Sequence, residues 1–291
     1  MSSNEEQTIL FQAAAITNIL SAFGCVFNVS VTVFLGKTRN SLGKMVVVLA
    51  ILDFVHHFPL IFSSMGAHSN AYCQVVSWIT YFGYASAIIF TSCFAHYLHQ
   101  SVSTASTSCL EKYYTKYLSL TISSGLVVGT LSVILNHRIY DPRREMCVFS
   151  RDQPGTTGLS DIIIFLIPGI ISIVSCLIYY IRTIILLRYV TERRHFELLV
   201  YPLILVVCLS PIMIGTTLLA LGLVKNAMFG YRLVCAIAFG SQGLLNSLAY
   251  GLSKTITSSI RNCCCYKAKR VEQEPLYHSV SSENSDHGPV L

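Results

Sequence analysis

The sequence predicts an all-α fold, a bundle of seven transmembrane helices. Three observations predict it. The 291-residue chain is 53% hydrophobic and only 12% charged, whereas a soluble globular protein carries about 25% charged residues. Its mean hydropathy is +0.59. Its apolar residues form seven stretches long enough to cross about 30 Å of hydrocarbon. So few charges cannot cover a soluble protein of this size, which excludes an ordinary cytosolic enzyme.

The polar segments between the apolar stretches define the expected order of elements. Residues 1–8 are expected to be a short extracellular N-terminus, retained because the first span has neither a basic region before it nor a small-residue cleavage site. The bundle occupies 9–254, followed by a juxtamembrane amphipathic helix at 255–266 and a disordered cytoplasmic tail at 267–291. The seven spans are expected at about 9–36, 45–65, 73–99, 117–136, 161–187, 199–223 and 232–253.

The basic residues predict the orientation of these spans. Of the 20 Lys and Arg residues, 14 lie in the tail or at the ends of spans that would face the same side as the tail. Basic residues concentrate on the cytoplasmic side of membrane proteins, so the N-terminus is expected outside and the tail inside. An odd number of spans without an internal repeat argues against an inverted-repeat transporter. The 14 residues are Lys37, Arg39, Lys44, Lys112, Lys116, Arg182, Arg188, Arg193, Arg194, Lys254, Arg261, Lys267, Lys269 and Arg270.

Two groups of cysteines carry information about location. Cys73 opens span three and Cys147 lies in the loop before span five, both on the oxidising side, where a disulfide would persist. Two unpaired thiols are the alternative. Three adjacent cysteines follow span seven beside basic residues, a pattern typical of S-palmitoylation. A zinc site there would lack a fourth ligand, and no metal or cofactor is expected elsewhere. The adjacent cysteines are Cys263, Cys264 and Cys265.

Polar residues inside the spans are candidates for function, because burying them in hydrocarbon costs several kcal/mol. Asp53 lies eight residues past the start of span two, about 12 Å above the inner boundary. Asn28 on span one and Asn246 on span seven lie at a similar depth. A carboxylate facing two carboxamides can be satisfied inside a bundle. This layer is either a static structural network or a switch that can hold a cation or a proton.

Histidines and lysines argue against two other functions. His56 and His57 lie near the middle of span two, whereas His96 and His99 lie at the inner end of span three, about 10 Å lower. Neither pair has an acidic partner at H-E-x-x-H spacing, which argues against a zinc hydrolase. A retinal protein needs a lysine in the middle of a span, and Lys254 lies at an end.

These features together resemble a G-protein-coupled receptor over nearly the whole chain. The motifs that carry the resemblance are Leu49-Ala50-Ile51-Leu52-Asp53, Cys208-Leu209-Ser210-Pro211 and Asn246-Ser247-Leu248-Ala249-Tyr250, together with Cys73 and Cys147. Rhodopsin-like receptors have proline where Ser247 stands. They end span three with an acidic-Arg-aromatic triplet, where this chain has His96-Tyr97-Leu98-His99-Gln100. These departures are closer to the cyclic-AMP-receptor-like branch, and the chain also resembles an orphan receptor-like transmembrane protein of vertebrates.

The resemblance implies a receptor in the plasma membrane that activates a heterotrimeric G protein and catalyses no covalent chemistry. Span six would pivot at Pro211, because a proline removes one helical hydrogen bond. Tyr250 would join the polar layer, and a small extracellular ligand is expected because the N-terminus is short. The predicted G-protein face is Tyr97, Arg188, Arg193 and Arg194; the predicted ligand pocket is Trp78, Tyr81 and Tyr84; the predicted phosphorylation sites are Ser279, Ser281, Ser282 and Ser285.

Alternatives remain for several of these assignments. The pocket aromatics are equally residues of ordinary helix packing, and the tail serines equally belong to a merely soluble tail. The outer loop contains Arg138, Arg143, Arg144 and Arg151, which favours an anionic ligand over a solvated basic surface. Partners other than ligand, G protein and lipid bilayer, such as nucleic acid, are not expected. The competing functions are an ion or proton transporter or channel that uses Asp53, His56 and His57, and a receptor-like protein that has lost coupling.

Overall fold

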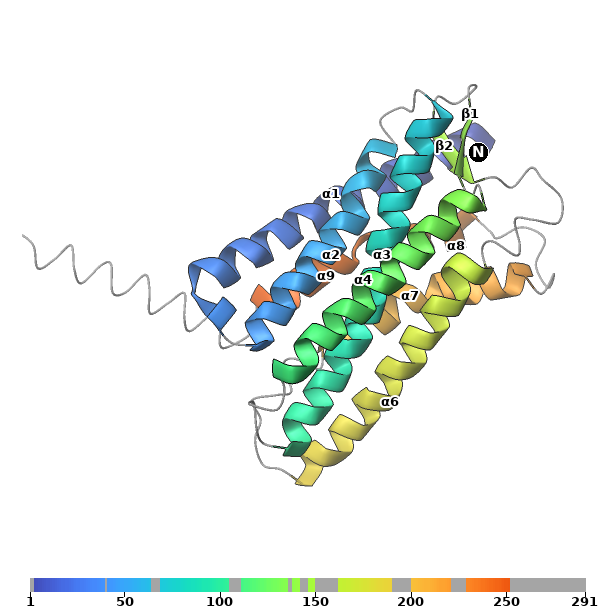
Figure 1. Ribbon diagram of the computed structural model, residues 1–291. Coiled ribbons are helices and arrows are strands. Elements are labelled where there is room, and N and C mark those ends of the chain that lie inside the picture. Colours follow the sequence, from blue (N-terminus) through green and yellow to red (C-terminus); the bar gives the residue numbers. More distant parts are fainter. Residues whose placement is uncertain are drawn as a thin grey trace, which may run out of the picture. The chain divides into compact units, whose positions relative to one another are not determined.

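The structure is a computed structural model (Figure 1). It describes residues 3–39, 41–63, 69–104, 111–135, 138–141, 146–149, 162–189, 200–220 and 229–251. This part of the chain is helical apart from turns and one two-stranded hairpin. Five of its helices are long and apolar enough to cross a membrane, or six if a bent pair counts as one span. The described part is therefore a helical bundle that fits a multi-pass membrane protein.

Each span expected from the sequence contains helical structure among its described residues. A shorter apolar helix covers the expected span six, with its apolar stretch at Pro202–Leu218, and two helices at an angle of 44° cover the expected span seven. A five-residue π-helix, η2 (Ile162–Leu166), leads directly into α6. The helices are α1 (Ser3–Phe34), α2 (Ser41–Ser63), α3 (Asn70–Thr104), α4 (Glu111–Ile134), α6 (Ile167–Tyr189), α7 (Val200–Ala220), α8 (Phe229–Gly240) and α9 (Gln242–Gly251).

Helix α1 begins earlier than the expected span boundary at residue 9. Its first turn contains Glu5 and Glu6, whose negative charges interact favourably with the positive end of the helix dipole. The helix is closed by Gly36, which has a φ of 62°, a left-handed conformation that glycine adopts without steric cost. A short 3-10 helix, η1 (Lys37–Arg39), then leads toward α2.

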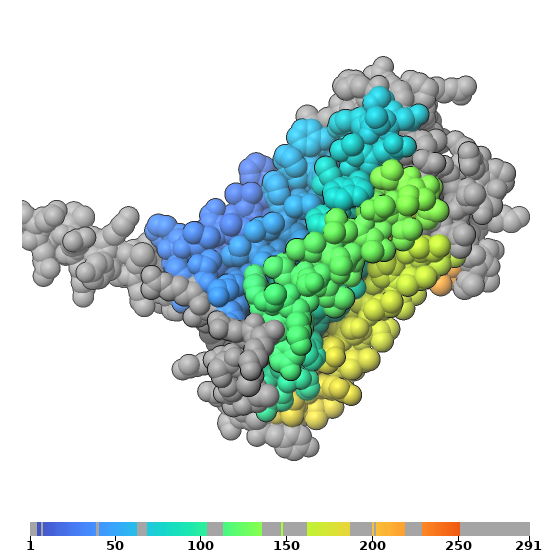
Figure 2. Space-filling model, viewed as in Figure 1, coloured from blue at the N-terminus to red at the C-terminus, as the bar shows by residue number. Residues whose placement is uncertain are grey.

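Helix α3 packs against α2, α4 and α6, whereas α1 packs against α2, α8 and α9. Figure 2 shows one face of the molecule, on which α4 in green lies between α2 in blue and α6 in yellow. Large apolar side chains are exposed on the outer faces of α1, α4 and α6, including Phe23, Val127 and Ile181. Such extensive apolar exposure is unfavourable in water and suits contact with lipid.

Glycines allow α3 to approach its neighbours closely. Gly125 and Gly129 on α4 form a G-x-x-x-G pattern, and a Cβ on Gly125 would come within 2.9 Å of the carbonyl oxygen of Phe82 on α3. On the other side, Gly83 of α3 lies against the backbone of α2 at His56. Small residues at such spacing let two helix backbones pack closely inside a membrane.

A hydroxyl from α1 occupies the break between α8 and α9. Ser21 donates to the carbonyl of Gly240 at 2.5 Å and accepts from the backbone N–H of Leu244 at 3.1 Å. Those two backbone groups would bond each other in a continuous α-helix. The sequence predicted one uninterrupted span over 232–253, and the structure differs because this side chain enters the helical ladder and produces a bend.

Candidate functional site

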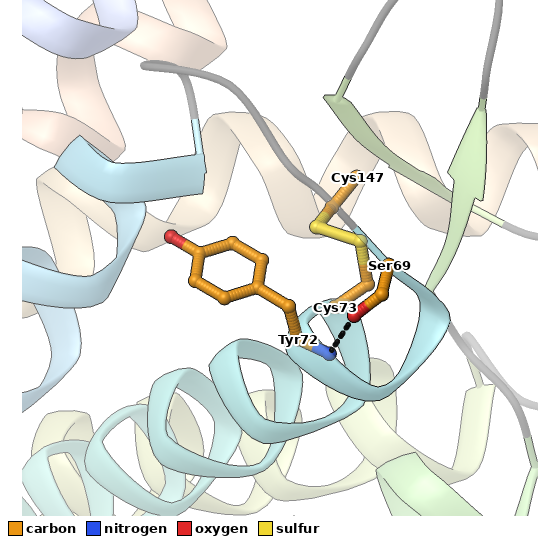
Figure 3. The surroundings of a disulfide bond; sticks show 4 residues. All are labelled: Ser69, Tyr72, Cys73 and Cys147. Atoms are coloured by element: carbon orange, nitrogen blue, oxygen red, sulfur yellow. Dashed lines mark hydrogen bonds between the residues drawn. A yellow bond between two sulfur atoms is a disulfide. The ribbon is translucent and has the colours of Figure 1, made fainter.

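One disulfide joins the start of α3 to a hairpin of β1 (Arg138–Asp141) and β2 (Met146–Phe149), which are antiparallel with Tyr140 opposite Cys147. Cys73 and Cys147 have Cα atoms 5.4 Å apart and form the bond that the sequence predicts (Figure 3). Ser69 caps the helix beside it, because its Oγ accepts from the N–H of Tyr72 at 3.2 Å. This cap satisfies a backbone donor that the first turn of a helix leaves open.

The carboxylate of Asp53 is buried between α2 and α9. Asn246 Nδ2 donates to Asp53 Oδ2 at 2.8 Å, and Gln242 Nε2 lies 3.5 Å from Asp53 Oδ1. Asp53 is only 1% exposed, so these donors take the place of water at both oxygens. The sequence predicts the pairing of Asp53 with Asn246. Gln242 was missed, although it precedes Asn246 by one helical turn and therefore shares its face.

The other two residues predicted for this layer, Asn28 on α1 and Tyr250 on α9, are also buried. Asn28 on α1 is 2% exposed, and Tyr250 follows Asn246 by one turn on α9. The backbone carbonyl of Asn28 accepts from Thr32 Oγ1 at 2.7 Å. Its side-chain Oδ1 has no hydrogen-bond partner among the described residues. Among the described residues, the hydrogen bonds of Asp53 to Asn246 and Gln242 join α2 to α9.

The four histidines of spans two and three lie in two separate surroundings. His57 Nδ1 lies 2.7 Å from Asn18 Oδ1 on α1, and His56 Nδ1 lies 3.1 Å from the Thr80 carbonyl on α3. His96 instead contacts Tyr117 of α4, with 2.6 Å between Nδ1 and the hydroxyl. Within the described ranges, no three His, Cys, Asp or Glu side chains come together in a way that could hold a metal ion.

The aromatic residues predicted for a ligand pocket face different neighbours. Trp78 stacks on Phe82, with ring centroids 5.4 Å apart, and its backbone lies over Gly129 of α4. Tyr84 donates to the Phe165 carbonyl at 3.2 Å, and its ring stacks on the Phe165 ring. Tyr81 is buried in the same core cluster as Tyr84. Tyr84 thus faces the bundle interior, whereas Trp78 faces α4.

Helix α7 continues through its predicted pivot. Pro211 lies within the helix, and its carbonyl accepts a short hydrogen bond from the hydroxyl of Tyr231 on α8. Gly215 makes room for the Tyr231 ring. No sequence pattern predicts the role of Tyr231, because its partner is a backbone atom of another helix.

The predicted intracellular features lie mostly outside the described part. Tyr97 is buried, at 4% exposure, and Arg188 lies in α6, although its side chain is not among those described. The segments 255–266 and 267–291 also lie outside the described ranges, as do Arg193, Arg194, Cys263, Cys264, Cys265, Ser279, Ser281, Ser282 and Ser285.

Comparison of the chain with protein-family models and with curated proteins found no match. The function has to be argued from the site. The best-defined group in the site is the buried acceptor Asp53. It is held by amide donors from α9, the helix that follows the bend, and this contact couples the position of α9 to that of α2.

Proposed function

We propose that this protein is a cell-surface receptor with seven spans, an outer N-terminus and an inner tail, which transmits a small-ligand signal to a heterotrimeric G protein. The observation that carries the proposal is the hydrogen bond from Asn246 to Asp53. The motif ending at Asp53 and the motif beginning at Asn246 are two of those that carry the resemblance to G-protein-coupled receptors. They lie 193 residues apart in the chain and are in direct contact.

The hydrogen bonds between helices support a mechanism in which one helix moves. One set joins α1, α2, α8 and α9, through Asn18 with His57, Ser21 with Gly240, and Asp53 with Asn246. A second set joins α3, α4 and α6, through Ser86 with Thr121, His96 with Tyr117, and Ser92 with Ser172. Helix α7 is joined to the first set where Tyr231 of α8 donates to the carbonyl of Pro211. Because this contact lies at the pivot, the inner end of α7 is the proposed moving element.

In this mechanism ligand binding moves the inner end of α7 outward about Pro211. The movement opens a crevice lined by Tyr97, Tyr250 and the basic residues Arg188, Arg193 and Arg194. A G-protein α-subunit enters this crevice and releases its nucleotide, so the receptor acts without covalent chemistry. The proposal also includes plasma-membrane location, acylation at Cys263, Cys264 and Cys265, and phosphorylation of the tail serines.

The test is basal nucleotide exchange in membranes across a panel of G-protein α-subunits. Wild type is compared with Arg193→Ala/Arg194→Ala, with Asn246→Ala and with empty vector. Arg232→Ala is the matched control, because Arg232 is an exposed arginine on α8, 3.6 Å from Glu6 near the start of α1, and a surface pair of this kind contributes little to stability. We expect exchange above vector that is lost in the double variant and retained in Arg232→Ala.

Two results would replace the proposal. Exchange equal to vector for every α-subunit, together with a membrane current that depends on Asp53, would indicate an ion pathway through Asp53, His56 and His57. Exchange equal to vector without such a current, even after exposure to a broad ligand library, would indicate a receptor-like protein that has lost coupling.

A further inference from the structure

The tautomer of His57 is fixed by a chain of two hydrogen bonds. Asn18 Nδ2 donates to the carbonyl of Ala14, one turn earlier on α1, at 2.7 Å. This contact orients the amide so that its Oδ1 faces His57 Nδ1, also at 2.7 Å. An amide oxygen only accepts hydrogen bonds. His57 Nδ1 therefore carries the proton and donates it.

The other ring nitrogen of His57 is then a bare acceptor. In a neutral imidazole with a protonated Nδ1, Nε2 has a lone pair and no hydrogen. His57 is 1% exposed, and its Nε2 has no hydrogen-bond partner among the described residues. Leaving a buried acceptor unpaired costs about 1–3 kcal/mol. Buried polar atoms in native proteins nearly always have a partner, so this nitrogen calls for a hydrogen-bond donor from outside the described chain.

The ring of His57 contacts that of His56, and through His56 it adjoins a cluster of aromatic rings. The neighbouring His56 faces the carbonyl of Thr80 through its Nδ1. The two imidazole rings have centroids 4.7 Å apart. Tyr84 and Phe239 contact His56, at 5.8 and 5.0 Å between ring centroids, and Phe165 contacts both of them.

The polar and charged groups near this cluster disfavour an anion. Asp53 precedes His57 by one turn on α2, and Nε2 of His57 carries a lone pair rather than a hydrogen. A negatively charged ligand group would face the lone pair of His57 and a carboxylate, whereas an N–H or O–H donor would satisfy the nitrogen, with aromatic rings nearby.

We propose that His57 Nε2 is the deep anchor of the ligand site, and that the ligand presents to it a neutral or cationic N–H or O–H group attached to an aromatic ring directly or through one carbon. The inference rests on the proposed function, because it takes the cluster of His56, His57, Tyr84, Phe165 and Phe239 as the place where a receptor ligand ends. The inference describes only the end of the ligand that lies deepest in the bundle. The basic residues of the outer loop would face the opposite end of the ligand.

The test uses four small probes that share a benzene ring. Phenol and benzylamine carry an O–H and an N–H donor, anisole has no donor, and benzoate is an anion. Their binding to the full chain in lipid nanodiscs is measured by saturation-transfer NMR, with empty nanodiscs as the background for partitioning into lipid. We expect saturable binding of phenol and benzylamine and no saturable binding of anisole or benzoate.

Three variants connect the binding to His57. In His57→Leu the affinity for phenol should fall at least ~10-fold, since a lost hydrogen bond to a buried acceptor is worth about this factor. His57→Gln, which restores an acceptor oxygen, should recover most of it. Asn18→Leu keeps His57 but releases its tautomer, and should also weaken phenol binding. Ser123→Leu is the control, because Ser123 is exposed on α4 and bonds carbonyls of its own helix.

Equal binding of phenol and anisole would overturn the inference, as would unchanged phenol binding in His57→Leu. Binding of none of the four probes would also overturn it, because a buried water would then be the partner of Nε2. Correct folding of each variant is checked by the Cys73–Cys147 disulfide and by thermal unfolding. No G protein is present in this experiment, so its failure and the failure of coupling are separate results.

Discussion

At the scale of single residues, a carboxylate inside an apolar bundle persists only where donors meet its oxygens. Asp53 meets this condition through Asn246 and Gln242. We expect Asn246→Leu to destabilise the folded protein by about 1–3 kcal/mol, since the variant leaves a buried acceptor without its shortest hydrogen bond. The measurement is the free energy of unfolding in detergent micelles, with Ser123→Leu on the exposed face of α4 as the control.

The exchanged pair distinguishes this hydrogen bond from simple packing. In Asp53→Asn/Asn246→Asp the same two kinds of side chain meet with donor and acceptor reversed. At least half of the stability that Asn246→Leu loses should therefore be present in this double variant. If the exchanged double variant is no more stable than Asn246→Leu, the two residues stabilise the bundle by other means than their hydrogen bond.

At the scale of helix pairs, the close approach of α3 and α4 depends on glycine. A Cβ at Gly125 would lie 2.9 Å from the carbonyl oxygen of Phe82. A backbone carbonyl, unlike a flexible side chain, cannot move away unless the helix itself shifts. We expect Gly125→Ala to destabilise the bundle by about 1–3 kcal/mol through overpacking. Gly230→Ala on α8 is the matched control, because nothing lies within 4 Å of its added carbon. Thermal unfolding measures both, and equal stability of the two variants would contradict the close packing.

The bend between α8 and α9 depends on a side chain of a third helix. In Ser21→Ala the hydroxyl between Gly240 and Leu244 is gone, so these backbone groups can bond directly and the two helices should straighten. The distance between spin labels at Arg232 and Leu248, both exposed, should then lengthen by about 2 Å. Ser21→Thr keeps a hydroxyl and should keep the shorter distance. An unchanged distance in Ser21→Ala would assign the bend to the neighbouring glycines.

These examples indicate what a sequence can predict in such a bundle. The depth of Asp53 and Asn246 follows from a fixed rise per residue, so a contact between them could be expected. The pairing of Cys73 with Cys147 could be expected because both were predicted on the oxidising side of the membrane. The contacts of Ser21, Tyr231 and Asn18 depend on how each helix rotates and tilts against its neighbours. Hydropathy does not record rotation, and these contacts therefore appear only in the structure.

At the scale of the whole molecule, the disulfide and the basic residues predict the same orientation. Cys73 and Cys147 form a bond that persists only on the oxidising side, while 14 of the 20 basic residues lie in segments that the predicted topology assigns to the opposite side. We expect an epitope tag before residue 1 to bind antibody on intact cells, and a tag after residue 291 to bind only after permeabilisation. A monothiol reagent that cannot cross membranes should react with neither Cys73 nor Cys147 until the cells are treated with a reductant, and with both afterwards. Tags found on one common side would require an even number of spans. Helix α7, whose apolar stretch Pro202–Leu218 is shorter than those of the five candidate spans, would then be the helix that does not cross.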